Sequence, residues 1–197
     1  AFAVLKTDGS VMAWGESAYG GAAPSGLTNV MTIYSTLFAF AALKTNGTVV
    51  AWGRSTHGGI VPNGLTDVQT IYSTSSAFAA LRTDGSVVCW GDAGNGGAAP
   101  SSGLTNVETI YSNEGVFAAL KTDGSVVVWG NSSLGGDASA VQNDLINVTT
   151  IYSTGYAFAA LKTDGSVVAW GSASYGGSAP SSGLTNVQTI SSAGSAF

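Results

Sequence analysis

Acidic residues recur at one place in the sequence and are the first candidates for chemistry. Each stands in a Thr-Asp-Gly triplet, and a ring of such carboxylates could hold a metal or exchange protons. The members of the series, with one Asn in the same place, are Asp8, Asn46, Asp84, Asp123 and Asp164. Asp-Gly and Asn-Gly also favour tight hairpin turns, because both residues tolerate positive φ. One carboxylate per repeat is too far from the next to share a proton or a metal, so we interpret these residues as turns.

Aromatic residues form two further series. The tryptophans recur at similar intervals: Trp14, Trp52, Trp90, Trp129 and Trp170. Their rings could stack on sugars, but a Trp at the end of a buried strand more often packs between sheets and bonds its N–H to a neighbour. We therefore interpret the tryptophans as structural. A second series follows an Ile in each repeat, and it could line a channel or wedge between sheets: Tyr34, Tyr72, Tyr111 and Tyr152.

The sequence offers few residues for catalysis. It holds one His and one Cys, which leaves no internal disulfide and removes the commonest metal ligand and general base from most schemes. We interpret His57 beside Arg54 as a solvated loop pair and Cys89 as a small buried hydrophobe. No Ser-His-Asp set or acid pair is evident. We expect a protein that is not an enzyme and has no catalytic residue, cofactor or metal site.

Composition and charge exclude several classes of protein. Of the 197 residues, 9% are charged and 45% are hydrophobic, with many aromatics, which excludes a disordered chain. The formal net charge of -5 argues against nucleic acid and anionic membranes as partners. No apolar run approaches the ~20 residues of a membrane helix. The first residues show neither initiator Met nor signal peptide, so we expect a processed, excised or engineered segment, with an extracellular or cell-surface bacterial location favoured.

A tandem repeat positions all of these residues. The tryptophans lie 38, 38, 39 and 41 residues apart. The consensus unit reads FAALKTDGSVVAWG, then a Gly/Pro/Ser stretch, then LTNVQTIYST. The pattern predicts one domain of five units with approximate bounds 1–38, 39–76, 77–115, 116–156 and 157–197. Length differences fall in the Gly/Pro/Ser stretch, as expected of a surface loop.

Each unit contains three strand signals separated by turns. FAALKT leads through the Asp-Gly turn into SVVAWG, and NVQTIYS follows the Gly/Pro/Ser loop, which could hold a short fourth strand. A small antiparallel sheet cannot bury both faces alone, so the units must stack. The pattern predicts an all-β fold, a β-propeller of ~39-residue blades, rather than a β-helix. If the chain is complete, we expect five blades, closed by combining the N- and C-terminal strands in one blade.

The motif ALKTDGSVVAWG, followed by Gly-Gly, Pro and LTNVQTIYS, resembles the regulator-of-chromosome-condensation repeat. It is most similar to the short bacterial repeats of beta-lactamase inhibitor protein II, and the similarity covers all five units. The resemblance implies a propeller, usually of seven blades, whose loops on one face bind partner proteins. This chain departs from that pattern in having five units and in placing Tyr-Ser after the Ile.

Comparison of the units shows where the fold does not dictate the residue. Variation falls just before each repeated Phe, including Gly194-Ser195 in the last unit, and just after each Trp-Gly. Because an antiparallel chain reverses at every turn, both variable sets must lie at one end of the sheets, opposite the Asp-Gly turns. The candidate binding residues on this face are Glu16, Tyr19, Leu37, Phe38, Arg54, His57, Asp92, Asn95, Glu114, Leu134, Tyr156 and Tyr175. Such side chains have the form of a recognition surface, and neutral drift in exposed loops is the alternative.

These observations favour a non-catalytic binding or scaffold propeller that presents its variable loops to a protein partner. A carbohydrate-binding lectin with repeated sites between blades is one alternative. A structural or assembly module cut from a longer surface or fibre array is another. We expect no nucleic-acid partner and no membrane insertion, and either a monomer or self-assembly through open blades.

Overall fold

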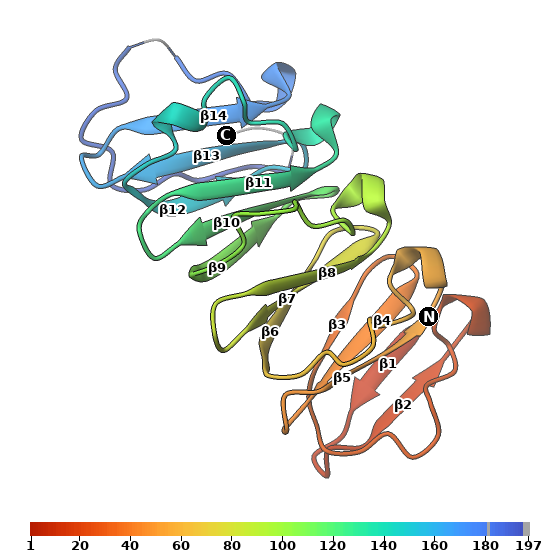
Figure 1. The fold of residues 1–197 in the computed structure, drawn as a ribbon. Coiled ribbons are helices and arrows are strands. Elements are labelled where there is room, and N and C mark those ends of the chain that lie inside the picture. Colours follow the sequence, from red (N-terminus) through yellow and green to blue (C-terminus); the bar gives the residue numbers. More distant parts are fainter. Residues whose placement is uncertain (181, 195–197) are drawn as a thin grey trace. The chain divides into compact units, whose positions relative to one another are not determined.

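The computed structural model describes residues 1–180 and 182–194, and the chain divides into two compact units. Unit 1 is residues 1–99 and unit 2 is residues 100–197. The strands of the described residues form small antiparallel sheets, and their other regular elements are short 3-10 helices (Figure 1). This content follows from a composition rich in β-branched and aromatic residues, with glycine-rich loops between them. The expected all-β fold is confirmed.

Unit 1 holds three sheets. The first pairs β1 (Phe2–Leu5) with β2 (Val11–Trp14). The second has the order β3 (Val30–Ser35), β4 (Ala39–Lys44), β5 (Val49–Gly53), and the third has the order β6 (Val68–Ser73), β7 (Ala77–Arg82), β8 (Val87–Gly91). A 3-10 helix follows the last strand of each sheet: η1 (Ser17–Tyr19), η2 (Ser55–His57) and η3 (Ala93–Asn95).

The described residues of unit 2 repeat the arrangement with two sheets. The first has the order β9 (Val107–Ser112), β10 (Val116–Lys121), β11 (Val126–Gly130), and the second has the order β12 (Val148–Ser153), β13 (Ala157–Lys162), β14 (Val167–Gly171). The helices η4 (Ser132–Leu134) and η6 (Ala173–Tyr175) follow their last strands, and η5 (Gln142–Asp144) lies in the long loop before β12.

The predicted segment FAALKT forms the middle strand of a sheet, and SVVAWG forms its last strand. The segment NVQTIYS forms the first strand of the next sheet. For example, DVQTIYS gives β6 and FAALRT gives β7, which pair antiparallel. The short fourth strand that the Gly/Pro/Ser loop could have held is not formed in the described ranges. A 3-10 helix occupies the start of that loop instead. It ends at a left-handed glycine, such as Gly58 with φ 92°, which interrupts any extended run.

The first sheet lacks a first strand, which in the other sheets pairs with the middle strand on the side opposite the last strand. β1 has the sequence of a middle strand, yet it pairs with β2 alone. We expected the missing strand to come from the NVQTI segment near the C-terminus. Residues 187–190 form no strand, because a strand needs a paired neighbour. Val187 still donates its N–H to Gly165 O in the preceding turn, as Val68 does to Gly47 O at the start of β6. The blade shared by both terminal strands is therefore not present among the described residues.

A stacked Phe-Trp pair closes the interface between successive sheets of a unit. The register places Phe78 opposite Trp90, and their ring centroids lie 5.2 Å apart. Both side chains are buried, and Trp90 donates its indole N–H to Gly58 O, at 2.9 Å, in the loop that follows the preceding sheet. A Cβ on Gly58 would lie 2.5 Å from the Phe78 ring. Glycine is therefore required where the sheets meet.

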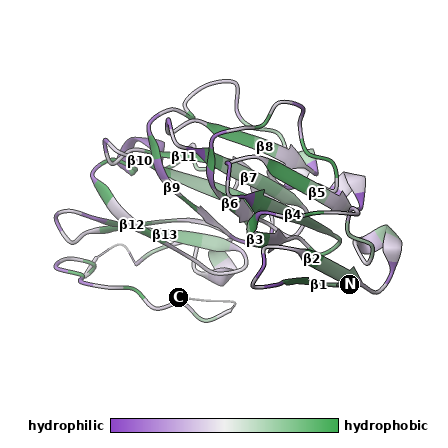
Figure 2. Ribbon diagram, turned by 90° about the horizontal axis from the view of Figure 1, so that it is seen from below, coloured by the Kyte–Doolittle hydropathy of each residue, from purple (hydrophilic) through white to green (hydrophobic). Residues whose placement is uncertain are grey.

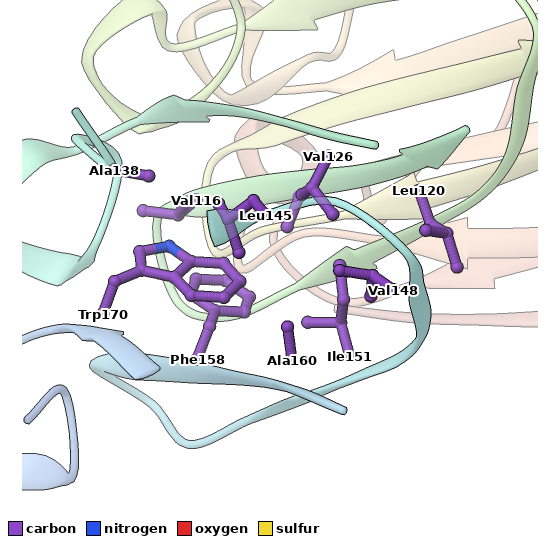
Figure 3. Close-up of a cluster of buried hydrophobic side chains, with 11 residues drawn as sticks. Val116, Leu120, Val126, Ala138, Leu145, Val148, Ile151, Phe158, Ala160 and Trp170 are labelled. Atoms are coloured by element: carbon purple, nitrogen blue, oxygen red, sulfur yellow. The ribbon is translucent and has the colours of Figure 1, made fainter. Parts of the chain in front are cut away.

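The stacking of the two rings recurs in unit 2, where the buried Trp170 Nε1 makes no hydrogen bond to any of the described residues. Phe158 and Trp170 stack at 5.2 Å inside a cluster of buried side chains that spans both sheets, with Val116 and Ile151 among them (Figure 3). The buried tryptophans are Trp52, Trp90, Trp129 and Trp170. Trp14 departs from the expected packing and is 52% exposed, because no sheet of unit 1 precedes β1 and β2.

The Asp-Gly turns join the middle and last strands of each sheet. Asp84 Oδ1 accepts hydrogen bonds from the backbone N–H and the hydroxyl of Ser86, at 2.9 and 2.6 Å. These bonds hold the pKa of the Asp84 carboxyl below its ordinary value of 3.8. Asn46 Oδ1 accepts the corresponding bonds from Thr48 at 3.2 and 2.7 Å. The pKa is lowered in the same way at Asp8, Asp123 and Asp164.

Replacing Trp90 tests the contact between sheets. Trp90→Ala should lower the free energy of unfolding by ~3–5 kcal/mol, because it empties a buried site and removes the bond to Gly58. Trp90→Phe keeps a ring and should cost less. Ile60→Ala, at an exposed side chain, should change stability little. Urea unfolding followed by fluorescence measures all three changes, and a loss under ~1 kcal/mol for Trp90→Ala would mean that this Trp does not hold the sheets together.

The turn carboxylates predict a specific response to acid. Because their pKa values are lowered by folding, their stabilisation is complete above 3.8 and is lost as pH falls through the lower folded values. Converting them to Asn, which already holds the turn at position 46, should flatten this response. The changes are Asp8→Asn, Asp84→Asn, Asp123→Asn and Asp164→Asn. Thermal unfolding followed by circular dichroism from about pH 6 to about pH 2 makes the comparison, and identical acid dependence of the two proteins would contradict the assignment.

Candidate functional site

Side-chain hydrogen bonds hold the variable loops of each three-stranded sheet together at one end of the sheet, which we call the loop end. In the second sheet, Thr36 in the β3–β4 loop donates its hydroxyl to His57 O in η2, at 2.9 Å. The equivalent pairs are Thr74 with Asn95 O, Asn113 with Leu134 O and Thr154 with Tyr175 O, at 2.9, 2.7 and 3.3 Å. Each loop before a middle strand therefore lies beside the 3-10 helix of its own sheet. The reversal of the antiparallel chain predicted this placement.

Four of the candidate binding residues meet in unit 1 in a cluster that we call the aromatic ladder: Tyr19, Phe38, His57 and Arg54. The Tyr19 and Phe38 ring centroids lie 4.8 Å apart, and the Phe38 and His57 centroids lie 4.9 Å apart in an edge contact. The Arg54 guanidinium carbon stands 5.7 Å from the centre of the Phe38 ring, within cation–π range. Tyr19 belongs to η1, His57 belongs to η2, and Phe38 and Arg54 lie in loops of the second sheet, so the ladder crosses between two sheets.

The other candidates of unit 1 surround the ladder or cap the short helices. Leu37, next to Phe38, is exposed, and its N–H donates to Ser75 O of the next sheet at 2.9 Å. Glu16 Oε1 accepts weakly, at 3.4 Å, from a backbone N–H at the start of η1. Asp92 Oδ1 accepts from Asn95 N and Nδ2, at 3.0 and 2.8 Å. Asp92 and Asn95 thus bond to each other and shape η3.

The candidates of unit 2 form a smaller group. Tyr156, before β13, packs on Tyr175 of η6 with ring centroids 4.4 Å apart. Glu114 is exposed, and its Oε1 lies 3.4 Å from the position of a Cβ on Gly155, beside Tyr156. Leu134 is half-buried against the cluster between the two sheets. Tyr156, Tyr175 and Glu114 therefore offer accessible surface, while Leu134 serves mainly the core.

Two of the repeated tyrosines contact the next repeat, and one of these contacts, made by Tyr34, joins two sheets. Tyr34 OH lies 3.2 Å from Thr70 Oγ1 on the first strand of the next sheet. In unit 2, Tyr152 OH lies 3.5 Å from Thr189 Oγ1. These contacts favour the interpretation of the tyrosines as wedges between sheets.

Sequence reasoning missed the residues that fix the loop end. Thr36, Thr74, Asn113 and Thr154 stand inside the variable stretch, but each is a polar residue directly after the first strand of its sheet, and that regularity was the available signal. The 3-10 helices were also missed, although a glycine follows each one except η5, which Leu145 follows. Ser195, which belongs to the variable pair of the last repeat, lies outside the described residues.

The chemistry of the loop end suits binding. In the ranges 1–180 and 182–194, no three His, Cys, Asp or Glu side chains converge as metal ligands, and no helix has the length and apolar character to span a membrane. The ladder presents aromatic faces beside a guanidinium and an imidazole. Such groups pack on apolar side chains and donate hydrogen bonds to carboxylates.

Comparison with known proteins shows the fold of this chain. No family model matches it, and no curated protein does. The ectodomain of the Physcomitrella patens receptor kinase CR4 is similar, with 17% identity and a TM-score of 0.57 over 84% of this chain and 48% of that one. Prp20p of Saccharomyces cerevisiae is similar, with 17% identity and a TM-score of 0.54 over 93% and 56%.

The CRINKLY WD40 ectodomain of the Arabidopsis thaliana receptor kinase ACR4 is also similar, with 20% identity and a TM-score of 0.52 over 83% and 59%. The chain thus spans about half the length of these proteins. At these identities the likeness concerns the fold. The four three-stranded sheets and one two-stranded sheet of the described residues, together with these neighbours, show that the chain has an RCC1-like β-propeller fold.

Proposed function

We propose that this chain is a non-catalytic binding propeller whose loop ends contact a protein partner. The aromatic ladder is the observation that carries the proposal. Tyr and Arg are the residue types most enriched, with Trp, at the energetic centres of protein interfaces. Here Phe38 contacts both Tyr19 and Arg54, on loops whose sequence the fold does not dictate. Tyr156 and Tyr175 form a second aromatic pair at the corresponding end of unit 2.

The loops are pre-organised for such contacts. Thr36 ties its loop to η2, and Leu37 N–H ties the same loop to Ser75 of the next sheet. A partner would therefore meet side chains that are already ordered, which reduces the entropy lost on binding. The ladder itself combines apolar faces with Arg54 and His57. We expect a partner surface that places an acidic side chain next to an apolar one.

Similar structures and the sequence motif support a protein partner. Prp20, the yeast RCC1, has been solved bound to Kap60, and the structure of Prp20p alone was described together with its binding to Gsp1p and histones. The ALKTDGSVVAWG motif adds a proposed kinship with the short bacterial repeats of beta-lactamase inhibitor protein II, a type of propeller expected to bind proteins through its loops.

A carbohydrate ligand is less well supported. Sugar stacking would need an accessible aromatic face at the same place in each repeat. The repeated tryptophans Trp52, Trp90, Trp129 and Trp170 are buried, whereas the accessible aromatic rings of the loop end differ from one repeat to the next.

Displayed peptides provide the test. A random peptide library panned on the immobilised chain should yield binders that contain acidic and apolar residues. The double variants Tyr19→Ala/Phe38→Ala and Tyr156→Ala/Tyr175→Ala remove the two aromatic groups. At least one of them should weaken a selected peptide about tenfold or more, because truncation of an aromatic anchor costs upwards of ~1.4 kcal/mol. Biolayer interferometry measures the affinities, and circular dichroism verifies the fold.

Met31→Ala is the matched control. Met31 is exposed and apolar, but it lies on strand β3 rather than in a loop. Its removal should leave peptide affinity unchanged. Selected peptides that bind both aromatic double variants as tightly as the parent chain would refute the proposed site.

A further inference from the structure

One face of the first sheet is apolar and uncovered. The register of β1 with β2 puts Phe2 opposite Trp14 and Val4 opposite Met12, so all four side chains share a face. Their exposed fractions are 67, 52, 39 and 54%. Phe2 and Trp14 stack at 5.4 Å, in the manner of the buried pairs. Both strands are hydrophobic throughout (Figure 2). We call this surface the Phe2–Trp14 face.

The last sheet of unit 2 borders an open apolar groove of about 320 Å³. Val167 and Ala169 line it from β14. Leu184, Val187 and Ile190 line it from the chain that follows.

The contact between the second and third sheets shows what fills a groove of this kind. Val49, Leu65, Val68 and Ile71 hold the same repeat positions there as Val167, Leu184, Val187 and Ile190 hold in the open groove. The next sheet completes that buried cluster with Phe78, Ala80 and Trp90. These three side chains have no counterpart among the residues that line the open groove.

The Phe2–Trp14 face holds the missing side chains. Phe2, Val4 and Trp14 have the repeat positions of Phe78, Ala80 and Trp90. The acceptor is present as well. Trp90 donates its indole N–H to Gly58 O. The glycine at the same position in the last repeat is Gly176, which lines the open groove.

The strand edges are complementary too. β1 leaves open the edge at which every other middle strand pairs with a first strand. Residues 187–190 read VQTI, which is identical to residues 68–71 at the start of β6, yet they pair with no strand among the described residues. A strand sequence without a partner and a strand edge without a partner therefore occur in the same chain.

We propose that the open groove of unit 2 binds the Phe2–Trp14 face of a second copy of this chain, and that residues 187–190 add a strand to β1 of that copy. The contact would continue the interface that the chain already builds between successive sheets. It joins unlike surfaces, so each copy has one face and one groove to offer. The inference stands apart from the proposed partner site at the loop end.

Solution mass provides the first test. Sedimentation velocity over a dilution series should show species heavier than the 19.6 kDa chain, with their fraction rising with concentration. Trp14→Glu places a charge in the face and Ile190→Glu places one in the groove. Each should raise the concentration of half-association at least about tenfold. Ile60→Glu, at an exposed loop residue outside both surfaces, should associate like the parent chain. A parent chain that stays monomeric at every concentration would overturn the proposal.

Mixing the two variants tests the polarity of the contact. Trp14→Glu retains an intact groove, and Ile190→Glu retains an intact face. Mixed at a concentration at which each alone is monomeric, they should form a one-to-one complex of twice the chain mass and nothing larger. If the mixture stays monomeric while the parent associates, the contact is not face to groove. Peptides selected at the loop end should bind both variants normally, which separates failure of this proposal from failure of the partner site.

Discussion

Everything in this molecule depends on one sheet packing on the next through a Phe-Trp pair. A sheet of two or three short strands cannot bury both of its faces, and its own hairpins are marginal in isolation. Trp90 shows how the contact is made. Its ring stacks on Phe78, its N–H reaches a glycine carbonyl in the preceding loop, and the absence of a side chain at Gly58 leaves room for both rings. Burial of apolar area and satisfaction of a buried donor are achieved by the same residue.

That contact also positions the loop end. Gly58 terminates η2, so the carbonyl that accepts the Trp90 N–H is joined directly to the helix that carries His57. Thr36 then fixes the neighbouring loop to His57 O. Backbone and glycine geometry support these loops, and the side chains between the fixed points are free to differ among repeats. A constant core with variable loops is the arrangement expected of a binding scaffold.

The same need to bury sheet faces explains the two uncovered surfaces, which are the Phe2–Trp14 face and the open groove of unit 2. Phe2 and Trp14 stack like the buried Phe-Trp pairs but are exposed to solvent. The groove beside Val187 and Ile190 is lined like the buried interfaces between sheets, but no Phe-Trp pair occupies it. Stacked repeats bury their faces only against neighbours. The loop end and the stacking faces are thus two different kinds of surface. The residues of the loop end vary between repeats and include polar side chains, whereas the stacking faces are apolar and recur from repeat to repeat.

The repeat, the three strands in each of the first four repeats and the end of the sheet at which the variable residues gather could be predicted from the sequence alone. These features are local: period-two alternation, Asp-Gly turns and the reversal of an antiparallel chain follow from neighbouring residues. Which side chains are buried and which segments pair as strands depends instead on the tertiary structure. Trp14 and Trp90 stand at the same repeat position, yet one is exposed and the other buried, because burial depends on whether a sheet lies in front. Residues 187–190 and 68–71 share a sequence, yet only the latter form a strand, because a strand exists only where a partner edge is within reach.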